Sequence, residues 1–198
     1  MARRLCGHAP GFTLLELLFV IAIAGTLAAL AVSHSLRALD DFHTRSAARY
    51  VAQRIVSARV DAIRRATAHG LRFVAVSSDY AWTTVADGNR NGVRTSELGS
   101  GIDRVLSEPD RIDAHFAGVS FGFHDGVPDA DGHPAGGADG VRIGAARLLV
   151  MNVDGTATSG TLYLRGRSRS QYAVRILGVT GRVRVLRFDA VRNRWFDI

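Results

Sequence analysis

One carboxylate lies inside an otherwise apolar stretch near the start of the chain. The stretch is APGFTLLELLFVIAIAGTLAALAV, residues 9–32, and its carboxylate belongs to Glu16. An acid inside an apolar helix opposes membrane insertion by about 2.5 to 3.5 kcal/mol on translocon scales, so such residues usually have a function. Glu16 is therefore the first candidate for chemistry, as a negative charge in apolar surroundings.

Three interpretations of this stretch compete. A conventional signal peptide would use Arg3 and Arg4 as its basic region and Ala29–Ala31 as its cleavage site, but the acid in its apolar core counts against it. A lipoprotein signal is weaker, because Cys6 has no apolar region in front of it. The third interpretation keeps residues 12–32 as a helix, since roughly 20 apolar residues suffice to span a bilayer. The early arginines then place the N-terminus in the cytoplasm and the rest of the chain outside.

A second group of candidate side chains lies in the sequence DGNRNG, residues 87–92. Asp87, Asn89 and Asn91 have the spacing of the first three ligands of a calcium loop, with Gly92 at the sharp turn. The acid that such a loop needs at its twelfth position is replaced by Leu98. The pattern therefore favours a glycine-rich β-turn, and calcium is a weak candidate.

Arginines gather in the C-terminal third of the chain. A two-residue turn at Thr180-Gly181 would pair Leu177 with Arg184 and place the arginines of two strands on one face, opposite a core face of Tyr172, Val174, Ile176, Val183 and Val185. Such a face could bind the phosphates of double-stranded DNA. The alternatives are a solvated arginine face and a contact for acidic neighbouring subunits. The candidate DNA-binding residues are Arg165, Arg167, Arg169, Arg175, Arg182 and Arg184.

The remaining polar residues do not indicate an enzyme. The seven histidines are scattered without zinc-ligand spacing, and no nucleophile motif accompanies the serines. We therefore expect no catalytic residue, no cofactor and no metal site other than the weak calcium candidate.

The elements that position these residues follow from hydrophobic periodicity. After residues 12–32, apolar residues recur every three or four positions, which predicts an amphipathic continuation of the helix over residues 33–70 with Gly70 at its end. From residue 71 the period falls to two, which predicts short strands over residues 71–198. The loop at residues 125–140 is expected to be mobile. The predicted fold class is α+β, a long N-terminal helix packed on an antiparallel, sandwich-like β domain.

Composition supports one domain with an appended segment. The chain has 198 residues, and all 25 basic residues are arginine. Its charge is uneven: residues 34–78 carry a net +5, residues 79–140 a net −7 and residues 142–198 a net +8. With one cysteine no intrachain disulfide can form, so the fold depends on its core.

The sequence GFTLLELL at residues 11–18 resembles the type IV prepilin motif. The resemblance implies that a membrane peptidase cuts after Gly11 and methylates the new N-terminal residue, Phe12. Glu16 is then the fifth mature residue, and its carboxylate neutralises the N-terminal amine of a neighbouring subunit. The leader would comprise residues 1–11, and the assembly helix residues 12–32.

Two further stretches, VADGNRNGVRTSELGSG and SGTLYLRGRSRSQYAVRILGVTGRVRVLRF, resemble the GspH/FimT branch of minor pseudopilins and minor pilins. This resemblance implies a structural subunit of a type II secretion pseudopilus or of a type IV pilus. The sequence GRVR, residues 181–184, also resembles an element of those members that bind DNA in natural transformation. The alternative function is therefore a DNA receptor.

The same resemblance predicts partners and location. We expect processing by a prepilin peptidase, assembly with other pilins or pseudopilins, and a single pass through the bacterial inner membrane. The C-terminal domain would lie in the periplasm or at a filament tip, and double-stranded DNA is an optional partner.

Overall fold

The computed structural model describes residues 11–198, except for the side chains of Leu30, Ser33 and His34. The predicted leader positions 1–10 lie outside the described residues. The chain forms two compact units, one ending at Leu39 and the other comprising Asp40–Ile198. Each unit is described by itself below.

The long helix α1 comprises Leu14–Arg65, and so contributes to both units. It ends four residues before the expected end near His69, and Ala66 takes a positive φ of 48° just after it. The sequence predicts Gly70 at the end of the helix. In the structure Gly70 lies inside strand β1 (His69–Val76) and is not a helix cap. A Cβ atom at Gly70 would collide with the carbonyl oxygen of Leu149, so glycine is needed there for close strand packing.

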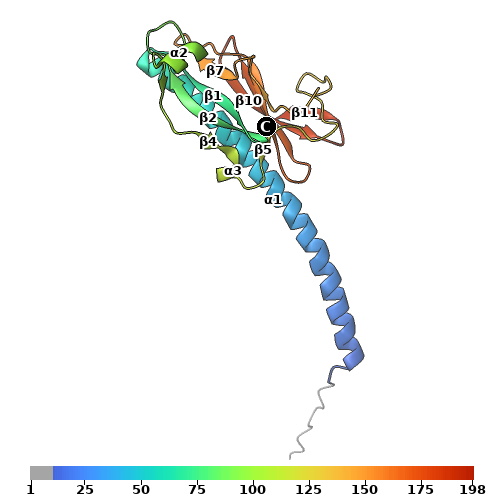
Figure 1. The fold of residues 1–198 in the computed structure, drawn as a ribbon. Coiled ribbons are helices and arrows are strands. Elements are labelled where there is room, and N and C mark those ends of the chain that lie inside the picture. Colours follow the sequence, from blue (N-terminus) through green and yellow to red (C-terminus); the bar gives the residue numbers. More distant parts are fainter. Residues whose placement is uncertain (1–10) are drawn as a thin grey trace, which may run out of the picture. The chain divides into compact units, whose positions relative to one another are not determined.

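Two antiparallel sheets follow the helix (Figure 1). The first has the order β3-β2-β1-β7, and β4 also pairs with β2. Its other strands are β2 (Asp79–Ala86), β3 (Arg104–Val105), β4 (Asp110–Arg111) and β7 (Leu148–Met151). The short helices α2 (Thr95–Ser100) and α3 (Ile112–His115) lie between its strands in the sequence.

The second sheet has the order β11-β10-β9-β8-β5, and β6 also pairs with β8. Its strands are β5 (Ser120–Phe121), β6 (Val141–Arg142), β8 (Gly160–Arg165), β9 (Gln171–Leu177), β10 (Arg182–Asp189) and β11 (Arg194–Asp197). A long N-terminal helix followed by antiparallel sheets is an α+β fold, so the predicted fold class is confirmed.

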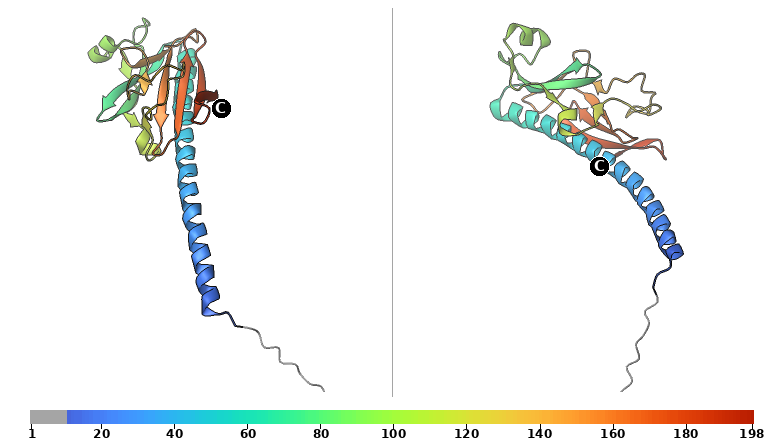
Figure 2. Two further views of the ribbon diagram at one scale, coloured as in Figure 1. Left: turned by 90° about the vertical axis from the view of Figure 1, so that its right-hand side faces the viewer. Right: turned by 60° about the horizontal axis from the view of Figure 1, so that its bottom comes forward.

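The main core of Asp40–Ile198 lies between α1 and the two sheets (Figure 2). The predicted helical stripe supplies its helix side, where small alanines let the sheets approach closely. The buried members are Ala48, Val51, Ile55, Ala58 and Ala62, with Ala47 beside them. Ala66, which continues the same spacing in the sequence, is exposed because the helix has already ended.

The strand prediction for residues 71–198 rests on a period of two that also covers residues 112–123, where it is only partly correct. The first residues of this stretch form α3, and only Ser120–Phe121 pair as β5. Phe121 also belongs to the core, where its ring meets Phe73, Tyr80 and Trp82 edge to face. Aromatic packing therefore fixes this segment together with the short pairing of β5 with β8.

The loop at residues 125–140, expected to be mobile, is held by specific contacts. The Asp129 carboxylate accepts hydrogen bonds from the backbone N–H groups of Asp131 and His133, both at 2.9 Å. The Trp195 indole donates to the carbonyl oxygen of Pro128 at 3.1 Å. Val127 is buried in a second apolar cluster, which also contains Tyr163 and Leu186. The sequence of the loop does not show these contacts, because some of the partners are far away in sequence.

Candidate functional site

The residues of the predicted processing site lie at the start of α1. Gly11 and Phe12 precede the helix, and the Phe12 side chain is 82% exposed. The Glu16 backbone N–H donates to Thr13 Oγ1 at 3.2 Å, which makes Thr13 the N-cap of the helix. Glu16 therefore lies in the first turn, where a negative charge also suits the helix dipole.

Large apolar side chains of the unit that ends at Leu39 are exposed along the helix. They include Phe12, Leu14, Leu15, Leu17, Leu18, Phe19, Val20, Ile21, Ile23, Leu27 and Val32. So large an exposed apolar surface is characteristic of a surface that another molecule covers. Within the part of the chain that the structure describes, no helix is both long enough and apolar enough to cross a membrane.

Comparison with known proteins gives one match. The family model for the prokaryotic N-terminal methylation motif matches residues 8–32. The match supports a type IV pilin-like protein. No curated protein and no solved structure matches the chain. The motif contains Gly11, Phe12 and Glu16, and it suggests processing by a prepilin peptidase, assembly with other pilins and anchoring in a membrane.

The β9–β10 hairpin differs from the predicted one in register. Leu177 pairs with Arg182, and Arg175 pairs with Arg184, so the connection has four residues rather than two. The turn begins early because Gly178 is bonded to the preceding connection: its N–H donates to Ser159 Oγ at 3.1 Å, and its carbonyl accepts from Ala157 N–H at 2.7 Å. A shift of two residues keeps every side chain on its face.

Three of the six candidate DNA-binding arginines are engaged by other groups. Arg184 Nε donates to Asp197 at 2.7 Å, and Arg175 Nη2 donates to Asp131 at 2.8 Å. Arg165 donates to Ser120 Oγ at 3.1 Å and to the Phe123 carbonyl at 3.3 Å. A phosphate would have to displace these partners.

The other three candidates are exposed but do not form one surface. Arg167 and Arg169 lie in the β8–β9 turn, whereas Arg182 follows the β9–β10 turn at the opposite end of β9. A seven-residue strand separates the two ends by roughly 20 Å. The six candidate arginines therefore do not form one continuous surface in the structure.

Two adjacent acids, which sequence reasoning did not single out, fix the β8–β9 turn. The Asp40 carboxylate accepts hydrogen bonds from the N–H groups of Arg167 at 2.7 Å and Ser168 at 3.1 Å. The Asp41 carboxylate accepts the Tyr172 hydroxyl at 2.9 Å and lies 3.4 Å from Arg187 Nη2. Burial, together with this acceptor, raises the pKa of Tyr172 to about 12. The only signal in the sequence is an acidic pair shortly after the apolar segment of residues 12–32.

In the calcium candidate, residues 87–92, the polar side chains form hydrogen bonds with nearby groups of the same chain segment. Asp87 accepts the backbone N–H groups of Asn89, Arg90 and Gly92 at 2.7 to 2.9 Å. Burial alone would raise the pKa of Asp87, but these donors outweigh it and lower that pKa. The amides of Asn89 and Asn91 donate to Glu97 at 2.9 and 2.8 Å. Among residues 11–198, no group of three or more acidic, histidine or cysteine side chains could hold a metal ion.

A polar cluster that the sequence did not reveal links α1 to the segment of β4 and α3. The Tyr50 hydroxyl donates to Asp110 Oδ2 at 3.0 Å and accepts from Arg54 Nη2 at 2.7 Å. His115 Nε2 lies 2.7 Å from Asp110 Oδ1. These residues are 60 or more positions apart in sequence from their helix partners, so their pairing follows only from the fold.

Proposed function

We propose that this chain is a structural subunit of a thin helical filament, namely a minor pseudopilin or minor pilin of the GspH/FimT branch. The observation that carries the proposal is the N-terminal methylation motif at residues 8–32. The α+β architecture supports it, because the GspH/FimT resemblance predicts a long helix followed by a β-rich domain. The resemblance of residues 159–188 to this branch supports the finer assignment.

The proposed mechanism is assembly through paired charges. Cleavage after Gly11 and methylation of Phe12 create a positively charged N-terminal amine. In the apolar interior of a filament this amine and the Glu16 carboxylate of a neighbour are tolerated only when they lie together, because an isolated buried charge costs several kcal/mol. Correct stagger between subunits is therefore the arrangement that neutralises both charges.

The same proposal gives the chain a location. Arg3 and Arg4 precede the apolar segment and keep the N-terminus cytoplasmic, so the unit Asp40–Ile198 lies on the periplasmic side of the inner membrane. Prepilin peptidase and the other subunits of the filament are its partners. Double-stranded DNA is not part of the proposal, because the candidate arginines are separated and half of them are engaged.

Intact mass of the membrane-extracted protein tests the processing step. In cells that contain a prepilin peptidase we expect a mature chain that starts at Phe12 and carries the mass of one added methyl group. Cells without the peptidase serve as the control and should yield the unprocessed chain. A mature start near Val32 would indicate a conventional signal peptide and would overturn the proposal.

The phenotype of a strain that lacks the gene distinguishes a type II secretion pseudopilus from a type IV pilus. Loss of exoprotein export assigns the subunit to a secretion pseudopilus, and loss of twitching motility assigns it to a pilus.

A further inference from the structure

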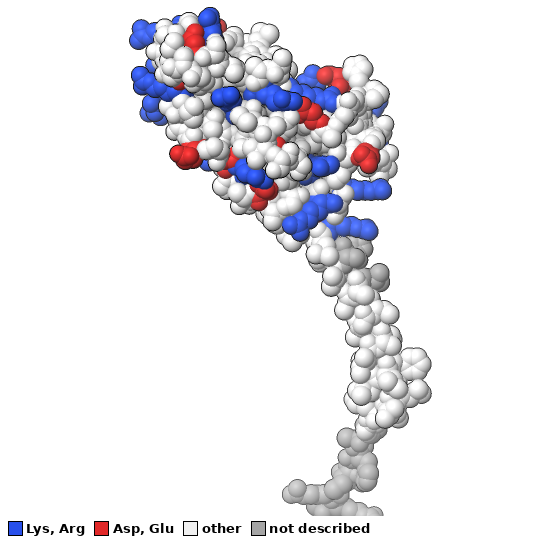
Figure 3. Space-filling model, in the orientation of Figure 1, with Lys and Arg blue, Asp and Glu red and all other residues white. Residues whose placement is uncertain are grey.

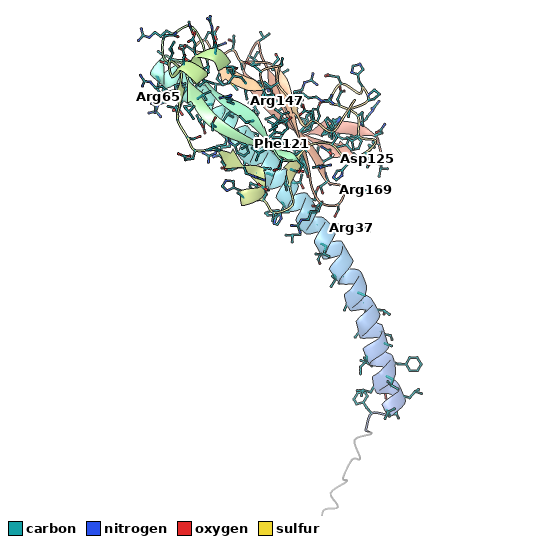
Figure 4. All side chains as sticks on the ribbon, viewed as in Figure 1. Arg37, Arg65, Phe121, Asp125, Arg147 and Arg169 are labelled. Atoms are coloured by element: carbon teal, nitrogen blue, oxygen red, sulfur yellow. The ribbon has the colours of Figure 1, made fainter. Side chains whose placement is uncertain are left out.

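Four arginines surround the point at which the unit Asp40–Ile198 begins. Arg45 lies on α1, Arg167 and Arg169 in the β8–β9 turn, and Arg187 on β10; all four are exposed. We call them the basic end. Figure 3 shows basic side chains gathered at this end of the unit, and Figure 4 labels Arg169 there.

The acids at the basic end offset only part of its charge, because Asp40 and Asp41 carry two negative charges against the four positive charges of the arginines. Both oxygens of Asp40 are occupied by backbone N–H groups, and Asp41 is shared by Tyr172 and Arg187. Within residues 11–198, Arg45, Arg167 and Arg169 form no ion pair. Three guanidinium groups are therefore available to an anionic ligand.

The turn that carries two of these arginines is held in place before any ligand arrives. Asp40 bonds two successive N–H groups of the turn, and the Gly166 N–H donates to the Ser170 carbonyl at 2.8 Å. A Cβ atom at Gly166 would lie 2.6 Å from Asp40 Oδ1, so glycine permits this close approach. A preorganised turn loses little conformational entropy on binding.

The chain itself indicates which anion lies nearby. The residue before Asp40 ends a unit whose apolar side chains are exposed, and Leu36 and Leu39 are 62% and 51% exposed. From Leu14 to Leu39 the helix rises about 40 Å, which is close to the thickness of a bilayer with its headgroups. On the proposed membrane anchoring, Asp40 follows the membrane segment in the chain, so we expect the turn bonded to Asp40 to lie close to the lipid phosphates.

We propose that Arg45, Arg167 and Arg169 bind the phosphate groups of anionic phospholipids at the membrane surface. Arginine pairs well with phosphate, and basic residues beside a membrane segment gain about 1 kcal/mol each from anionic lipid, roughly a fivefold change in affinity. The contact holds the domain on the membrane before assembly and is given up when the subunit enters a filament. This inference rests on the proposed function.

The test uses the full chain in lipid nanodiscs. A polarity-sensitive fluorophore is attached at Ser168→Cys in a Cys6→Ser background, because Ser168 is exposed and Cys6 is the chain's only cysteine. Quenching by neutral acrylamide is compared between discs of phosphatidylcholine alone and discs that also contain phosphatidylglycerol. We expect protection of the label in the anionic discs, and loss of this protection at high salt.

Matched variants identify the arginines responsible. Arg167→Gln combined with Arg169→Gln should abolish the protection. Arg64→Gln combined with Arg65→Gln removes the same charge from the other end of the unit, where Figure 4 labels Arg65, and should leave the protection intact.

Three results would overturn the inference. Equal quenching in neutral and anionic discs would remove the lipid contact, and protection by added duplex DNA but not by phosphatidylglycerol would make the turn a nucleic-acid surface. Failure of the chain to enter the discs would remove the anchoring on which the inference depends. Since the N-terminal mass is measured separately, a chain with methylated Phe12 but no lipid preference loses only this inference.

Discussion

Asp40 and Asp41 show how far apart the partners of adjacent residues can be in sequence. Asp40 binds backbone N–H groups of residues 127 and 128 positions away, and Asp41 binds a hydroxyl 131 positions away. No sequence window contains both partners, so these contacts could not be predicted. Gly11, Phe12 and Glu16, in contrast, form a motif within six residues, and the family model finds that motif independently. A motif of neighbouring residues can be predicted from the sequence, whereas contacts between residues that only folding brings together cannot.

Replacing Tyr172 with phenylalanine tests the contact with Asp41. At neutral pH Tyr172→Phe should lower the free energy of unfolding by about 2 kcal/mol, because a hydrogen bond to a carboxylate is lost. The Tyr172 pKa rises from 10.0 to about 12 on folding, so the contribution of the hydroxyl is complete below pH 10 and declines as pH rises towards 12. Parent and variant should therefore converge in stability over that range.

Urea unfolding of Asp40–Ile198 at several pH values between 8 and 12, followed by tryptophan fluorescence, measures this convergence for both chains. A difference between parent and variant that stays constant with pH would show that burial and the contact with Asp41 do not raise the pKa of Tyr172 in the folded protein.

The elements followed the hydrophobic pattern except where glycine or packing intervened. The period of two predicts short strands over residues 71–198, and β1, β2, β8, β9 and β10 lie in that part of the chain. The sequence predicts Gly70 as a helix cap, but Gly70 allows close packing of β1 against β7. The β9–β10 turn begins earlier than predicted because Gly178 has a partner outside the hairpin. Glycine signals conformational freedom or lack of space, and sequence alone does not distinguish the two.

The buried stripe of α1 predicts a sharp contrast between neighbouring residues. Ile55 is fully buried in the main core, and Val56 beside it is 46% exposed. Ile55→Ala should lower the free energy of unfolding by about 3 kcal/mol through lost burial and a cavity, whereas Val56→Ala should change it by less than about 0.5 kcal/mol. Chemical denaturation of Asp40–Ile198 measures both. Similar losses from the two variants would mean that the helix does not pack on the sheets by this face.

At the scale of the whole molecule, sequence reasoning reached the fold class and the pilin-like N-terminus. It did not place the arginines, because net charge by segment says nothing of which charges are paired. Residues 142–198 carry a net +8, yet Arg175 and Arg184 are bound to acids, and the exposed candidates Arg167, Arg169 and Arg182 lie at separate ends of β9. The fold decides which arginines form ion pairs with acids, so the charge of a surface follows from the structure and not from the net charge of a segment.

Glu16 has two explanations that act at different scales. Locally, Thr13 and Glu16 have the spacing of a capping box, and the Glu16 N–H donates to Thr13 Oγ1 at 3.2 Å. In an assembly, the Glu16 carboxylate would pair with the N-terminal amine of a neighbouring subunit. Alanine at this position would remove both roles, so a more selective pair of variants is needed.

Glu16→Gln and Thr13→Ala separate the two explanations. Glutamine serves a capping box as glutamate does, but it has no charge, so Glu16→Gln should still be processed and reach the membrane while its incorporation into filaments is lost. Thr13→Ala removes the cap, at about 1 kcal/mol of helix stability, and keeps the charge, so this variant should still co-assemble. Sheared-filament and cross-linked fractions measure incorporation, and intact mass measures processing. The charge-pairing role would be wrong if Glu16→Gln entered filaments as well as the parent does, or if both variants lost incorporation equally. Glu16 would then be only a residue that starts the helix.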